Sequence, residues 1–334
     1  MKQIQHDTKM NASEYAVVWS QYMNDSLSRC VLKHFLQDAK DENIREVFAF
    51  ALKLSERHLE KIKLLLKNEN QPVPVGFSEE DVKADVPGLF TDTFKIVYLH
   101  IMSLHGLTRY AGATSVCSRK DIRQYFMRCT SEGLDLYDRT TEIALQKGII
   151  DKAPTLHNRQ TVHFIKKGYL TGWLGKRRPI NAIEISGVFL NMQKTMVKMV
   201  LELGFSQVCK SKEIRTYMER ARGLCVKHFE ILASLLKEEN LHVPKVFESE
   251  VTDSAVSPFS DKLMLFHITG LLSAAISYYG EAAALSQRRD IVSAYTRMNV
   301  EIALIAEDGM QLMIRNGWFE APPAAADHEA LAKE

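Results

Sequence analysis

The sequence predicts an all-α protein built from two tandem four-helix bundles, and three observations lead to this prediction. The chain of 334 residues repeats itself once, since LLKNENQPVP at 65–74 returns as LLKEENLHVP at 235–244. Within each copy, apolar residues recur at intervals of three and four, which is the spacing of a helix with one buried face. Each copy also contains one long connection, which lies between its second and third predicted helices.

The match between the two copies extends over most of the chain. It includes NASE (11–14) with NAIE (181–184), HLE (58–60) with HFE (228–230), and RKDI (119–122) with RRDI (288–291). The offset is 170 residues up to Phe77 and 169 residues after it. So long a match with one change of offset indicates duplication of a whole domain. A solenoid would repeat every 20–50 residues or so.

Each copy contains signals for the start and end of four helices. The expected starts are Asn11, Asp41, Thr91 and Ser118 in the first copy, and Asn181, Ser211 and Ser260 in the second. Glu14 and Glu184 stand three residues after their asparagines, as in a capping box, so we interpret both as helix caps rather than metal ligands. The fourth helix ends before Gly148 or Gly317, where a glycine can adopt the left-handed C-cap conformation.

The long connection decides the predicted topology. It spans residues 70–90 in the first copy and 240–259 in the second, whereas the other turns within a copy are a few residues long. Twenty extended residues reach about 66–72 Å, and helices of this length are about 40 Å long. We therefore expect the connection to run back along the bundle, so that the second and third helices are parallel. This is the ferritin-like topology.

These boundaries divide the chain into four parts. We expect a first ferritin-like bundle at 1–150, a joining segment at 151–180, a second ferritin-like bundle at 181–319 and a disordered tail at 320–334. The joining segment is basic and contains Phe164, Tyr169 and Trp173, a composition that can bind single-stranded nucleic acid. We favour a linker whose aromatic side chains dock on the bundles while its charges stay solvated.

Net charge, cysteine spacing and hydropathy limit the partners and the location that the sequence predicts. Lys and Arg number 43 against 41 Asp and Glu, so the chain as a whole does not predict a polyanionic partner. The five cysteines form no CxxC pair, which favours reduced thiols in a cytoplasmic protein. The apolar run 263–285 contains His267 and Glu281, and we interpret it as a tightly packed core helix rather than a membrane span.

A histidine and a glutamate occupy the buried stripes of the second and fourth predicted helices. Along its helix, His58 lies about 24 Å from the end of the bundle, and Glu132 lies about 22 Å from the same end. The two side chains can therefore meet in the middle of the bundle, and His228 and Glu301 repeat the arrangement. A buried carboxylate is unfavourable unless it is paired, hydrogen-bonded or bound to a metal.

Two interpretations of these positions remain open. In the first, each His–Glu pair is a hydrogen bond that fixes the register of the helices. In the second, Asp25 and His105 fall near the same level and complete a metal site with His58 and Glu132, a nitrogen and oxygen set that suits Zn, Mn or Fe. The second copy has Thr195 and Ala274 in place of Asp25 and His105, so it keeps too few ligands for a tight site.

A carboxylate-bridged di-iron centre is disfavoured. Such centres use a Glu-x-x-His motif on each of two helices. The residues three before His58 and His228 are Ser55 and Cys225, and the fourth predicted helices contain no Glu-x-x-His.

The chain also resembles a known family. The segments YMNDSLSRCVLKHF, NQPVPVGFSEEDV, SRKDIRQYF, KRRPINAIEI, SEVTDSAVSPFSDKLMLFHITG and EDGMQLMIRNGWFE are similar to those of the two-copy proteins of domain-of-unknown-function family 3231, found mainly in endospore-forming Bacillus-type bacteria. The resemblance implies a ferritin-like bundle and a distant relationship to spore-coat-type proteins. It implies no activity and no catalytic residues.

The sequence most directly predicts a non-enzymatic structural or binding protein, associated with sporulation or stress. It shows no arrangement of residues typical of nucleophilic catalysis, no phosphate-binding loop and no di-iron motif. The alternative is a metal-binding protein or metal-dependent oxidoreductase that uses the site in the first repeat. Enzymatic activity, partners and oligomeric state stay open; a homo-oligomer is one alternative, whereas a membrane or a nucleic acid is disfavoured.

Overall fold

The computed structural model describes residues 9–83, 85–156, 161–162, 164–165, 168–170, 177–325 and 327–328. These residues form eight α-helices and no strand of a sheet. The helices of the first repeat are α1 (Ala12–Asp38), α2 (Glu42–Asn68), α3 (Asp92–Val116) and α4 (Lys120–Gln146). Those of the second repeat are α5 (Ala182–Val208), α6 (Lys212–Lys237), α7 (Asp261–Leu285) and α8 (Arg289–Arg315).

The two repeats have the same topology. In the first, α1 packs against α2 and α3, and α4 packs against α3 and α2; α5 to α8 repeat these neighbours in order. The connection from α2 to α3 contains the short 3₁₀ helix η1 (Glu79–Asp81), and that from α6 to α7 contains η2 (Glu248–Glu250). The prediction of two tandem four-helix bundles, each with a long crossover between its second and third helices, is confirmed.

The repeated phrase that ends α2 and α6 acts as a helix stop. Asn70 and Asn240 have φ angles of 55° and 56°, in the left-handed region that asparagine tolerates better than most residues. The following backbone N–H groups, of Gln71 and Leu241, donate to the carbonyls of Leu66 and Leu236. This closure satisfies carbonyls that the helix end would otherwise leave unpaired.

The two predicted capping boxes are confirmed, whereas Thr91 makes no side-chain cap and the N-cap of α4 is Arg119 rather than Ser118. Glu14 and Glu184 complete capping boxes with Asn11 and Asn181. Each carboxylate reaches further, to the start of the last helix of its repeat: Glu184 accepts the backbone N–H of Arg288 at 2.8 Å, and Glu14 accepts that of Arg119 in the same way. One side chain thus ties two helix starts together in each bundle.

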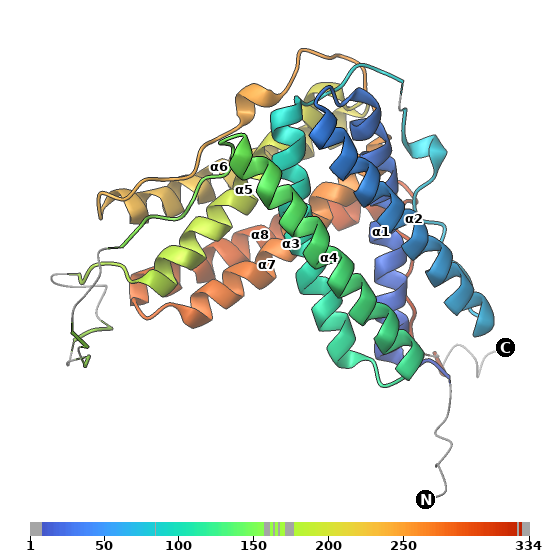
Figure 1. The fold of residues 1–334 in the computed structure, drawn as a ribbon, viewed down its shortest axis with the longest axis horizontal. Helices are drawn as coiled ribbons and strands as arrows, with labels where there is room; N and C mark the ends of the chain where they lie inside the picture. Colours follow the sequence, from blue (N-terminus) through green and yellow to red (C-terminus); the bar gives the residue numbers. More distant parts are fainter. Residues whose placement is uncertain are drawn as a thin grey trace, which may run out of the picture.

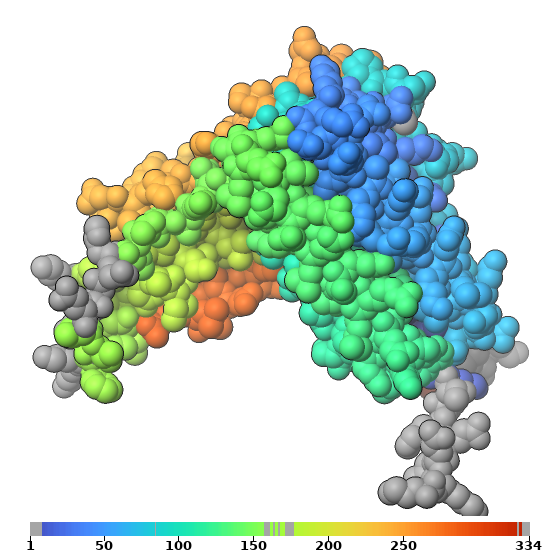
Figure 2. Space-filling view, viewed as in Figure 1, coloured from blue at the N-terminus to red at the C-terminus, as the bar shows by residue number. Residues whose placement is uncertain are grey.

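The two bundles diverge like the arms of an inverted V and meet at the apex, where the two crossovers lie (Figure 1). There the crossovers hydrogen-bond to each other through their backbones, including Lys83 N to Pro258 O at 2.7 Å and Thr252 N to Leu89 O at 3.0 Å. One large cluster of buried apolar residues runs through both repeats, and a second, smaller cluster lies within the first repeat. The space-filling surface is hollowed below the apex, between the arms (Figure 2).

The chain ends differ in part from expectation. The carboxylate of Glu320, the first residue of the predicted disordered tail, accepts the backbone N–H groups of Val75 and Gly76 at 2.9–3.1 Å. The tail therefore begins with an anchored residue.

The joining segment docks only in part. The Tyr169 ring stacks under Arg178, whereas Phe164 is 91% exposed and does not dock on a bundle. Trp173 lies outside the described residues.

Helix α7 is long and mostly apolar. Among the described residues it is the one helix long and apolar enough to cross a membrane by length and composition, and half of the relevant window is buried in the structure. It packs on α8 and α5, and Leu263, Met264 and Leu265 are completely buried. These are the contacts of a core helix.

Candidate metal centre

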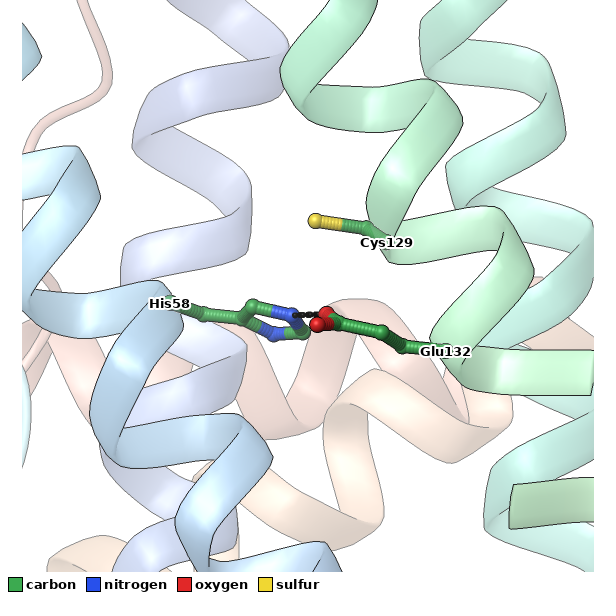
Figure 3. A group of neighbouring side chains, drawn as sticks. All are labelled: His58, Cys129 and Glu132. Atoms are coloured by element: carbon green, nitrogen blue, oxygen red, sulfur yellow. Dashed lines mark hydrogen bonds and ion pairs between the residues drawn. The ribbon is translucent and has the colours of Figure 1, made fainter. Parts of the chain in front are cut away.

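Three helices of the first repeat bring polar side chains to the middle of the bundle. His58 comes from the buried stripe of α2, and Asp25 from α1. Cys129 and Glu132 lie on α4, and their spacing of three residues puts both side chains on one face of that helix. Figure 3 shows His58 extending toward Glu132, with the Cys129 sulfur above the pair.

The group is compact enough to share one ion. His58 Nε2 lies 3.0 Å from Glu132 Oε2, and one ligand atom from each of His58, Cys129 and Glu132 lies within 4.8 Å of the other two. The outer oxygen of the carboxylate, Glu132 Oε1, accepts a hydrogen bond from Arg57 at 2.9 Å. The inner oxygen is therefore the one that faces the group.

Asp25 contacts the opposite side of the histidine ring. Its Oδ2 is 3.3 Å from His58 Nδ1, and both side chains are buried. Burial alone would lower the pKa of His58, but interactions with Asp25 and Cys129 outweigh burial and raise the pKa above its usual value of 6.5. The two atoms are close but do not meet hydrogen-bond geometry within the described residues. A carboxylate beside Nδ1, with Nε2 facing the ligand group, is nevertheless how metal-binding histidines are commonly placed.

His105 is not brought to this group, which corrects the predicted ligand set. Its Nδ1 lies 2.9 Å from the hydroxyl of Tyr278 on α7, so it belongs to the contact between the repeats. Burial lowers the pKa of His105 to about 3. Cys129 joins the group instead. The sequence does contain a signal for it, because Cys129 stands on the buried stripe three residues before Glu132.

The second repeat has the same His–Glu pair but lacks the aspartate and the cysteine of the first repeat. His228 Nε2 lies 2.8 Å from Glu301 Oε2, and Lys227 takes the outer oxygen at 2.7 Å, as Arg57 does in the first repeat. Thr195 and Met298 replace Asp25 and Cys129. Burial lowers the pKa of His228 to about 4, although Glu301 opposes this shift.

The polar atoms around the group of the first repeat are consistent with a ligand. Gln21 Nε2 donates to Cys129 Sγ at 3.8 Å. Within the described part of the chain, the buried atoms around the group that have no hydrogen-bond partner are Gln21 Oε1, Asp25 Oδ2, His58 Nδ1 and Tyr125 Oη. Buried polar atoms without partners are rare, and an ion or ordered water commonly accounts for them.

The donor set indicates which ion would fit. A thiolate, an imidazole nitrogen and a carboxylate oxygen are all ligands of Zn²⁺, with bonds of about 2.0–2.3 Å. Sulfur favours Zn²⁺ over Mn²⁺, which prefers oxygen ligands. Three protein ligands leave one tetrahedral position to water or to another small molecule. In this arrangement Asp25 would orient His58 rather than bind the ion itself.

Comparison with known proteins gives a family and one structural likeness. Residues 1–162 and 169–331 each match the model of a family described as "Protein of unknown function (DUF3231)". No curated protein matches the chain. A crystal structure of a putative spore coat protein from Bacillus halodurans C-125 is similar, with 14% identity and a TM-score of 0.42, over 45% of this chain and 97% of that protein.

Proposed function

The chain belongs to the DUF3231 family of proteins of unknown function, and on that premise we propose that its first repeat is a metal-binding bundle. The ion is Zn²⁺, and its ligands are His58 Nε2, Cys129 Sγ and an oxygen of Glu132. The observation that supports this proposal is that one ligand atom from each of these three residues lies within 4.8 Å of the other two, inside the bundle.

The difference between the repeats supports the same proposal. A His–Glu pair that only fixed helix register would need neither a cysteine nor a second carboxylate. The first repeat has both, as Cys129 and Asp25, whereas the second has neither at the equivalent positions. The first repeat therefore binds the ion, and the second serves as its structural partner. A cytoplasmic location and an association with sporulation or stress stay predictions.

Cobalt substitution provides the test. Untagged protein freed of metal by a chelator is titrated with Co²⁺, whose absorption reports both coordination geometry and a bond to thiolate sulfur. We expect one Co²⁺ per chain and a sulfur-to-cobalt band. His58→Ala should abolish binding, and Cys129→Ser should remove the band.

The second repeat supplies matched controls for that titration. His228→Ala removes the equivalent histidine, and Cys225→Ser removes another buried thiol; both should bind Co²⁺ as the wild type does. Absence of binding by the wild type, or equal loss in His58→Ala and His228→Ala, would show that the proposal is wrong.

A structural role of the pairs is the second candidate. It is favoured by one observation, the recurrence of the pair as His228 and Glu301 with the same distance pattern. Suppose that His58 and Glu132 have only this structural role. Then His58→Ala and His228→Ala will lower the thermal midpoint to a similar extent, and Zn²⁺ will not raise the midpoint of the wild type. If the first repeat binds Zn²⁺, the ion will raise the midpoint of His228→Ala but not that of His58→Ala.

A further inference from the structure

A second feature lies between the repeats rather than inside one bundle. A cavity of about 350 Å³, partly open to solvent, lies between α1, α3 and α4 of the first repeat and α7 of the second. Its walls include Tyr98, Phe126 and Phe266, and its polar side chains include Gln21 and Asp25. Neither bundle could form this cavity alone, so its shape depends on how the repeats pack.

Small residues on α7 keep the cavity open. Gly270 and Ala274, one helical turn apart, both line it. A Cβ atom added at Gly270 would have no other atom of the described chain within 4 Å, the helix's own backbone aside. A larger side chain at this position would therefore enter open space instead of displacing the core.

The polar wall of the cavity offers acceptors. Gln21 and Asp25 are separated by one turn of α1 and are 6% and 5% exposed. Within the described residues, the buried atom Gln21 Oε1 accepts no hydrogen bond. An unsatisfied buried acceptor is unfavourable, and a donor on a bound molecule would satisfy it. The carboxylate of Asp25 also favours a donor. Arg109 lines the cavity as well, so the lining carries one negative and one positive side chain, which suits a ligand without net charge.

The remaining walls set the rest of the ligand's chemistry. Aromatic rings surround a space more than twice as large as a cavity of about 150 Å³ that holds one benzene molecule. Aromatic side chains favour an aromatic guest, through edge and offset contacts in addition to burial of apolar area. A single small ring that carries a substituent fits this volume.

We propose that the cavity between the repeats binds a small neutral aromatic molecule that carries a hydroxyl donor, a simple phenol, with the hydroxyl directed at Gln21 and Asp25. The ring packs among Tyr98, Phe126 and Phe266. Gln21 and Asp25 also lie beside the candidate metal centre, but the aromatic ring would occupy the space between α1, α3, α4 and α7 and needs none of the three atoms that would hold the ion.

The test compares p-cresol with toluene, which has the same ring and methyl group but no hydroxyl. Binding to the full chain, kept in a chelator so that the metal site plays no part, is followed by ligand-observed NMR and by the shift of the thermal midpoint. We expect p-cresol to bind about tenfold or more tightly than toluene. Equal affinity for the two compounds, or no binding of p-cresol, would overturn the proposal.

Filling the cavity locates the binding. Gly270→Leu should abolish p-cresol binding. Gly223→Leu is the matched control, because Gly223 is on α6 outside the cavity and its Cβ position is likewise open within the described chain; it should bind p-cresol normally. Unchanged binding by Gly270→Leu would show that the compound binds elsewhere. Should that variant fail to fold, Ala274→Leu fills the same space and carries the same expectation.

The acceptor is tested separately. Gln21→Leu replaces the amide, with its unpaired oxygen, by a somewhat shorter apolar side chain that cannot accept a hydrogen bond. We expect this variant to lose most of the preference for p-cresol over toluene, while Gly223→Leu keeps it. A preference unchanged in Gln21→Leu would contradict the assigned orientation of the hydroxyl.

Discussion

The two mid-bundle histidines have the same glutamate partner and differ in what faces the other ring nitrogen. Asp25 lies against His58 Nδ1, whereas Thr195 occupies the position equivalent to Asp25 in the second repeat and hydrogen-bonds to Tyr279. The pKa of His58 is raised and that of His228 is lowered. Both Asp25 and Cys129 raise the pKa of His58, and the second repeat has Thr195 and Met298 in their places.

Replacement of the orienting carboxylate tests its role. Asp25→Asn keeps the shape of the side chain but removes its charge, so His58 is held less firmly and is a weaker ligand. We expect Zn²⁺ affinity, measured by competition with a chromophoric chelator, to fall by about 10–100-fold. Thr195→Val at the equivalent position of the second repeat should leave the affinity unchanged. Equal affinity of Asp25→Asn and wild type would show that Asp25 has no part in the site.

The buried histidine of the second repeat predicts a dependence of stability on pH. His228 is faced by Glu301 of α8, Lys227 of α6, Lys198 of α5 and Tyr279 of α7. Because its pKa is lowered to about 4 in the folded protein, only the unfolded chain takes up a proton between pH 6.5 and 4. Its contribution to stability is thus complete above pH 6.5 and is lost as the pH falls toward 4.

Urea unfolding at pH 7 and pH 4.5 measures this contribution. His228→Gln has no such proton to take up, so its free energy of unfolding should fall less with pH than that of the wild type. We expect a difference of about 2–3 kcal/mol between the two pH dependences. Identical dependences would mean that His228 is protonated in the folded state as well. His100 and His267, whose pKa values burial also lowers to about 4, contribute to both proteins.

At the scale of the element, two helix glycines have opposite surroundings. Gly309 on α8 lies where a Cβ atom would overlap the hydroxyls of Tyr217 and Thr269, so the glycine permits the close approach of α8 to α6 and α7. Gly223 on α6 is exposed, and its Cβ position is open within the described chain. Helix propensity favours alanine at both positions by the same amount, but packing opposes it at one of them.

Alanine substitutions should therefore have opposite effects. We expect Gly223→Ala to raise the free energy of unfolding by about 0.5–1 kcal/mol. Gly309→Ala should lower it by about 1–3 kcal/mol, because the core must shift to accept the methyl group. Chemical denaturation of both variants beside the wild type provides the measurement. A stabilising effect of Gly309→Ala would mean that α8 can move away from its neighbours without loss.

At the scale of the whole molecule, the repeats share their core. Phe35 and Phe90 of the first repeat lie in edge contact with each other, and Phe259 of the second packs against Phe35 and Phe205. Backbone hydrogen bonds between the crossovers close the same junction. Separation of the repeats would expose these rings to water, which is strongly unfavourable.

We expect the chain to unfold in one cooperative transition. Calorimetric and van't Hoff enthalpies should agree, and far-ultraviolet circular dichroism and tryptophan fluorescence should give the same midpoint. Two resolved transitions would show that the shared core does not couple the repeats. Charge reversal at the junction, such as Asp81→Lys, removes the hydrogen bond from Ser260 to Asp81 and should lower the midpoint of the single transition.

The sequence by itself determined the duplication, the helix boundaries, the crossovers and the meeting of His58 with Glu132. These features depend on local hydrogen bonds at Asn11, Asn70 and Gly148 and on distances along helices, which residue spacing already specifies. Only the tertiary structure decided that His105 faces Tyr278, that Cys129 joins His58, and that a cavity lies between the repeats. The physical reason is that rotation of a helix about its axis, and the packing of one bundle on another, are set by contacts between residues far apart in the chain.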